Sequence, residues 1–187
     1  DVAFITHSGE KVKVATDDGI HYFDSNIPST FDWNVKNLIE GQYDSITFVF
    51  GLLPEQNVTG YFVNPPENNM AWPDVLGGGY HYMQINGTWL AANDTVKMFN
   101  LHTGIGQIYD QGEITSFVPN FFTVSLPLNS FAIDREALSG LQLVMNVNEW
   151  FSNPNVFDLD EFGGSIMQNQ AAQQLLRENG KSVFSVR

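Results

Sequence analysis

The run Ser45-Ile46-Thr47-Phe48-Val49-Phe50 decides the fold class of this 187-residue chain. Its β-branched and aromatic side chains favour an extended strand over a helix. Shorter runs of strand character recur at residues 11–15, 79–85, 96–101, 117–126 and 141–147, separated by turn residues. This spacing predicts an all-β fold, an antiparallel β-sandwich, with one short C-terminal helix.

That helix is expected between Ser165 and Gly180. Ser165 and Gln168 have the spacing of a capping box, and Gly180 is a helix stop signal. Apolar residues recur every four positions from Met167 onward, which predicts one face packed onto the sheets.

Two connections are also predicted. Asp17-Asp18-Gly19 and Asn86-Gly87 have the composition of hairpin turns. The stretch 54–79 is rich in Pro, Asn and Gly, and a loop of that length in a compact domain is often functional.

The length, charge and composition of the chain limit the functions that it can have. A chain of 187 residues fits one domain, so we expect a single β-sandwich domain over 1–187, with a natural N-terminus removed before Asp1. The formal net charge of −13 repels nucleic acids and attracts cations. The chain has no cysteine, which excludes disulfides and thiolate metal sites. No apolar run approaches the ~18 residues of a transmembrane span.

Metal ligands must therefore come from the histidines, methionines and carboxylates, and copper suits imidazole combined with thioether. His81 and Met83 alternate along one run, whereas His102 ends another, so both histidines would converge if these strands pair. The alternative is a half-buried, hydrogen-bonded histidine. No Gly-x-Ser-x-Gly elbow, His-Glu-x-x-His motif or phosphate loop is present, so we expect no enzyme.

A second hypothesis is a cell-surface module that binds a glycan or a protein without metal. It rests on four aromatic residues that could form a sugar-stacking platform: Trp72, Trp89, Tyr61 and Tyr82. The competing interpretation buries these rings in the core.

Three segments together resemble the MbnP-like (methanobactin-partner) family of exported proteins, in the version found in Gram-negative bacteria. They are residues 41–52, the run Met70-Ala71-Trp72-Pro73 leading to Gly77-Gly78-Gly79-Tyr80-His81, and Phe99-Asn100-Leu101-His102-Thr103-Gly104. Residues 145–151 and 166–170 also resemble this family, so the likeness covers nearly the whole chain.

The resemblance implies an all-β copper-binding or copper-handling protein of the periplasm or cell surface. It leaves open a lipid anchor and a redox or transport partner. Some members use two histidines and a tryptophan oxidised to kynurenine, that tryptophan lying two residues from a histidine. Here Trp72 lies nine residues before His81. We therefore expect a simpler copper site of His102 and His81, with Met83 and Met70 as further donors.

Overall fold

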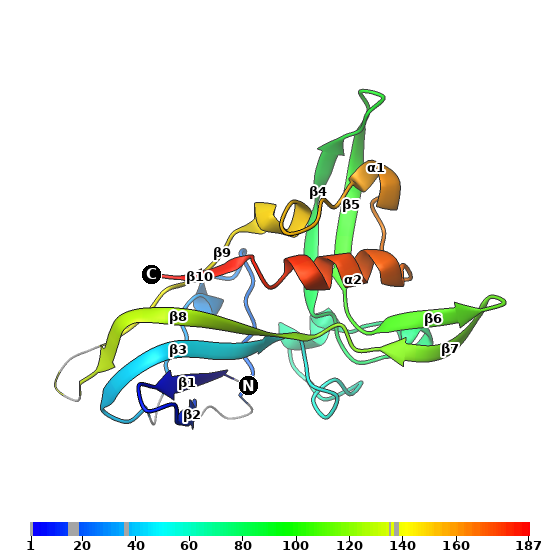
Figure 1. Ribbon diagram of the computed structural model, residues 1–187. Helices are drawn as coiled ribbons and strands as arrows, with labels where there is room; N and C mark the ends of the chain where they lie inside the picture. Colours follow the sequence, from blue (N-terminus) through cyan, green and yellow to red (C-terminus); the bar gives the residue numbers. More distant parts are fainter. Residues whose placement is uncertain (1, 15–18, 36–37, 135, 137–138) are drawn as a thin grey trace. The chain divides into compact units, whose positions relative to one another are not determined.

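The computed structural model describes residues 2–14, 19–35, 38–134, 136 and 139–187 (Figure 1). Strands dominate, and the helices are short. The strands are β1 (Val2–Thr6), β2 (Lys11–Lys13), β3 (Gly41–Phe50), β4 (Met83–Leu90), β5 (Val96–Thr103), β6 (Gly106–Asp110), β7 (Glu113–Val118), β8 (Phe122–Ile133), β9 (Leu143–Met145) and β10 (Phe184–Val186). The α-helices are α1 (Leu159–Phe162) and α2 (Gln170–Asn179), and the 3-10 helices are η1 (Pro28–Thr30), η2 (Glu67–Met70), η3 (Asp74–Leu76) and η4 (Val147–Phe151).

The chain divides into two compact units, each assembled from segments distant in sequence. Unit 1 comprises Asp1–Val49, Thr123–Val144 and Phe184–Arg187. It contains a four-stranded sheet in the order β2-β1-β3-β8, in which β1 runs antiparallel to both neighbours. Phe4 packs edge-on against Tyr43, with ring centroids 5.5 Å apart. The predicted strand at 45–50 is thus confirmed as the greater part of β3.

Unit 2 comprises Phe50–Phe122 and Met145–Val183. It contains two antiparallel hairpins, β4–β5 and β6–β7. Its core includes several almost fully buried apolar side chains, among them Trp72, Leu101, Trp150, Ile166 and Leu176. Together with the sheet of unit 1, these antiparallel strands confirm the predicted all-β class and are consistent with the predicted sandwich.

The predicted turn at Asn86-Gly87 is wrong, because both residues lie inside β4. The ring of Phe99 on β5 covers Gly87, and an added Cβ would lie 2.6 Å from Phe99 Cζ. The glycine therefore makes room for a ring across the strand pair and does not reverse the chain. The chain reverses between β4 and β5, where Asp94 has a φ of 59°.

Other strand boundaries also differ from the prediction. The single strand expected over 117–126 is divided between β7 and β8, with a break at Pro119. A further hairpin, β6–β7, was not predicted, although Gln111-Gly112 supplies the two positive φ angles, 52° and 89°, of a tight hairpin turn. The turn expected at 17–19 falls largely outside the described residues.

The C-terminal helix is confirmed, but its predicted start is wrong. Asn169, not Ser165, is the N-cap of α2, since its side chain accepts a hydrogen bond from Ala172 N. Ser165 instead forms a parallel bridge with Asn100 on β5. Gly180 follows the helix in a right-handed conformation, so the glycine is needed for space and not for a positive φ: an added Cβ would collide with the rings of Phe122 and Trp150.

Within the described part of the chain, none of the helices has the length and apolar character needed to cross a bilayer.

Candidate metal centre

The stretch before β4 folds back on itself and fixes the position of His81. Trp72 N donates to Gly79 O at 2.8 Å, and His81 N donates to Met70 O at 2.6 Å. Residues 77–79 are three glycines with φ angles of 111°, 65° and 79°, which a side chain would strain. The glycines thus allow the reversal that sets His81 beside the preceding chain.

Two polar side chains hold this reversal in place. Thr59 Oγ1 accepts a hydrogen bond from Gly79 N and donates one to Asp74 Oδ1, both at 2.9 Å. Asn57 Oδ1 accepts from Tyr80 N at 2.8 Å. Residues 54–79 contain no strand in the structure, so these side chains do the anchoring that strand pairing would otherwise provide.

The structure brings the two predicted histidines together. His81 lies just before β4, and His102 lies near the end of β5. Their ring centroids are 5.0 Å apart, and the ring planes meet at 87°. Both residues belong to unit 2, so the pair depends only on contacts within that unit.

His81 presents one ring nitrogen without a partner. Its Nδ1 lies 2.9 Å from Met70 O, and a carbonyl can only accept, so Nδ1 carries the proton. Its Nε2 is buried and has no hydrogen-bond partner. Burial lowers the pKa of His81, and two main-chain hydrogen bonds oppose that shift only in part. The ring is therefore a neutral imidazole with its lone pair on Nε2.

His102 has the opposite tautomer. Its Nε2 lies 2.8 Å from Asn86 Oδ1, which can only accept a hydrogen bond, so Nε2 carries the proton and the lone pair is on Nδ1. Burial lowers the pKa of His102, and the nearby His81 lowers it further. Asn86 on β4 thus orients the ring of its neighbour on β5.

Trp72 is the residue that sequence reasoning set aside. Its side chain is 2% exposed, and its ring lies against His81 at a centroid distance of 4.8 Å and an angle of 71°. Trp72 Nε1 donates to Leu76 O at 3.2 Å, inside the same reversal. Trp72 and His81 are nine positions apart in sequence, and the turn at 73–79 brings them into contact.

The His-x-Gly motif has a packing role. Gly104 lies under Trp72, and a Cβ there would be 2.6 Å from Trp72 Cε3. The backbone of Gly104 is held on both sides, because its N donates to Gln173 Oε1 and its O accepts from Asn120 Nδ2. These bonds fix the end of β5, and with it His102, against α2.

Met83 and Met70, the two predicted thioether ligands, lie differently relative to the histidine pair. Met83 is buried and lies opposite Thr103, one residue along from the Gln84–His102 pair. Successive side chains on a strand point to opposite faces, so Met83 and His102 project to opposite faces of the hairpin. Met70 contacts His81 through its main-chain carbonyl.

The other two histidines have partners of their own in unit 1. His7 Nδ1 lies 3.1 Å from Asp44 in an exposed position. His21 stacks on Trp33 at a centroid distance of 5.0 Å, and its Nε2 lies 2.9 Å from Thr30 O. Among the described residues, no group of three or more His, Cys, Asp or Glu side chains could hold a metal. The candidate centre is therefore the imidazole pair itself.

The alternative hypothesis of a sugar-stacking platform lacks one of its four rings, because Trp72 is buried. Trp89 is engaged elsewhere, since its Nε1 donates to Asp160 Oδ1 at 3.2 Å. Asp160 also accepts from Ala92 N, and Asp158 caps α1. These acidic side chains organise the tip of the β4–β5 hairpin.

Comparisons with known proteins agree with the resemblance seen in the sequence. Neither curated proteins nor solved structures yield a match. The model of the MbnP family matches residues 1–168, which cover the histidine pair, Trp72 and both hairpins of unit 2. Membership suggests a copper-related role, and on this match the chain belongs to the MbnP family.

Proposed function

We propose that this protein is an exported copper-binding protein that holds one copper ion between His81 and His102 and carries out no catalytic turnover. The observation that carries the proposal is the buried, unpartnered Nε2 of His81, next to a second neutral imidazole. A buried polar atom without a partner is costly, and a bound ion is one of the ways to satisfy it.

The surroundings of the pair suit a metal ligand. Ligating histidines usually donate their other N–H to a carbonyl or carboxylate, which fixes the tautomer. Met70 O accepts this hydrogen bond from His81 Nδ1, and Asn86 Oδ1 accepts one from His102 Nε2. His81 Nε2 and His102 Nδ1 are then the ligand atoms, and both rings are already deprotonated near neutral pH because burial lowers their pKa.

The small donor set favours copper over zinc. Structural zinc sites use four protein ligands, and catalytic ones use three. Two imidazoles meet neither requirement, and no third His, Asp, Glu or Cys joins them within the described part of the chain. Copper accepts imidazole donors readily, and the bound ion would supply a soft Lewis acid without a need for further carboxylates.

The proposed location and partners rest on the family and on the composition. Charged residues are only 16% of the chain, and cysteine is absent. We expect a periplasmic or cell-surface protein that passes copper to or from a redox or transport partner there.

The test is a competition titration with Cu(I) and Cu(II) against colorimetric chelators, using metal-free protein. One copper per chain is expected, with affinity lowered at least ~100-fold in the double variant His81→Ala/His102→Ala. The matched control is His7→Ala/His21→Ala, which removes two histidine side chains from unit 1. This variant should bind copper as the native protein does. Unchanged affinity in the first double variant would refute the site.

Zinc supplies a second readout. The protein should bind Zn(II) more weakly than Cu(I) under the same conditions. Equal or tighter zinc binding that depends on both histidines would show a metal site with a different cargo.

A further inference from the structure

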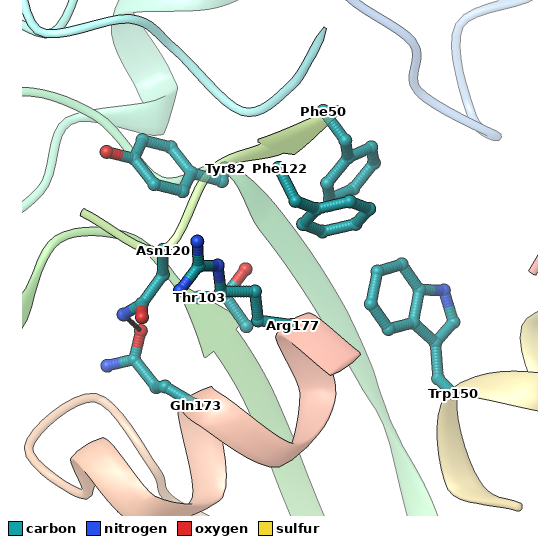
Figure 2. A pocket seen from close by; sticks show the side chains of 8 residues that line it. All are labelled: Phe50, Tyr82, Thr103, Asn120, Phe122, Trp150, Gln173 and Arg177. Atoms are coloured by element: carbon teal, nitrogen blue, oxygen red, sulfur yellow. Dashed lines mark hydrogen bonds between the residues drawn. The ribbon is translucent and has the colours of Figure 1, made fainter. Parts of the chain in front are cut away.

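Unit 2 contains a cationic side chain for which the fold provides no counter-charge. Arg177 on α2 points into a cavity of about 10 Å³, with its guanidinium directed toward Tyr82 (Figure 2). Arg177 Nε is buried and has no hydrogen-bond partner. Among the described residues, no carboxylate forms an ion pair with Arg177, and none of the eight residues that line the cavity is acidic.

The polar neighbours of Arg177 already use their acceptor atoms. Asn120 Oδ1 accepts from Gln170 Nε2 at 3.0 Å. Gln173 Oε1 accepts from Asn120 Nδ2 at 2.9 Å and from Gly104 N at 3.2 Å. These amides are tied to one another and to the end of β5, so they do not compensate the guanidinium.

The remaining walls offer little negative charge. Tyr82 accepts a hydrogen bond from Asn57 Nδ2 at 3.3 Å, and burial raises its pKa to about 12, so its hydroxyl stays protonated. The opposite side is aromatic: Phe50 packs on Phe122 and Trp150, with ring centroids 5.2 and 5.4 Å away. Figure 2 shows these rings on the far side of Arg177 from the Asn120–Gln173 pair.

Arg177 is half-buried, but its Nε is a buried donor of a charged group without a partner, and leaving such a donor unsatisfied is costly. The missing partner must be small, because the cavity has room for about one water-sized sphere. From the unpartnered Nε, the engaged amide oxygens, the lack of a carboxylate in the cavity wall and this volume, we infer that Arg177 binds a single monatomic anion of the chloride class. The anion site does not involve His81 or His102, so its test is independent of the test of copper binding.

The first experiment measures thermal unfolding of the copper-free protein while chloride replaces gluconate at constant ionic strength. At a chloride concentration about five times its dissociation constant, the Tm should rise by about 2–4 °C. The control Lys181→Gln removes an exposed positive charge just after α2 and should keep this rise. Arg177→Met should abolish it, whereas Arg177→Lys should retain it with weaker affinity.

The second experiment does not depend on any variant. A crystal of the native protein soaked in bromide should give an anomalous peak within hydrogen-bonding distance of Arg177 Nε. A water molecule at that position with no bromide peak would overturn the inference. So would a Tm that does not respond to chloride, or one that responds equally in Arg177→Met.

Discussion

Gly104 connects the packing of the candidate metal centre with its chemistry. The ring of Trp72 occupies the space that a side chain at position 104 would need. We expect Gly104→Ala to destabilise the protein by about 1–3 kcal/mol, the usual cost of overpacking a closed site. Urea unfolding measures this change. Copper affinity should fall as well, since His102 lies two residues away. Gly140→Ala is the control, because an added Cβ there meets nothing within 4 Å. Equal stability of the two variants would contradict the packing role.

The histidine pair should make the stability of the metal-free protein depend on pH. Burial lowers the pKa of His81 and His102 below the ordinary value of 6.5. Below that value the unfolded chain takes up protons that the folded chain does not. The stabilisation is therefore complete above about pH 6.5 and is lost as the pH falls toward the folded pKa values. The slope is at most about 1.4 kcal/mol per pH unit for each histidine.

Urea unfolding at several pH values between about 5 and 8 measures this slope. The double variant His81→Asn/His102→Asn should flatten it in this range. A slope that persists in the double variant would assign the effect to other groups.

At the residue scale, one approach between side chains could be predicted from the sequence. His81 and His102 were expected to converge if their strands pair, and they do. The contact of Trp72 with His81 could not be predicted from separation along the chain, because it depends on a turn built from three glycines with positive φ. Met83 was placed on the face of His81 by assuming one continuous strand, but β4 begins only at Met83.

At the scale of elements, the start of α2 gives a direct test of capping. Asn169 accepts from Ala172 N, whereas the capping box predicted from Ser165 does not form. Asn169→Ala should lower the free energy of unfolding by about 0.5–2 kcal/mol. Ser165→Ala, an exposed position outside the helix, should change it by less than about 0.5 kcal/mol. Chemical unfolding of both variants decides between the two caps, and a larger loss at Ser165 would favour the original prediction.

The strands were predictable to the extent that local preference determined them. The β-branched run at 45–50 forms most of β3, since each of its residues favours an extended backbone. Asn86-Gly87 has the composition of a turn, yet it stays in β4 because the Phe99 ring needs the space above Gly87. That contact is between strands, and one strand's sequence does not reveal it.

At the scale of the whole molecule, the net charge is the property that can be read from the sequence without knowledge of the fold. A formal charge of −13 comes directly from composition and makes contact with a phosphate backbone unfavourable whatever the fold. The division into two units was not accessible in the same way. Each unit joins segments that lie far apart in sequence, such as 1–49 with 123–144, and no shift in composition marks the boundaries.

The same charge should accelerate the arrival of a copper cation. The attraction acts over a Debye length, which shrinks from about 30 Å in 0.01 M salt to about 3 Å in 1 M salt. Cu(I) supplied as its cationic acetonitrile complex should therefore associate at least ~10-fold more slowly at the higher salt concentration. Stopped-flow quenching of tryptophan fluorescence can follow binding, because Trp72 contacts His81. The dissociation rate should change little, since the bonds between the metal and its ligands act at short range and are little affected by salt. An association rate independent of salt would show that capture is limited by a local step at the histidines and not by the field of the molecule.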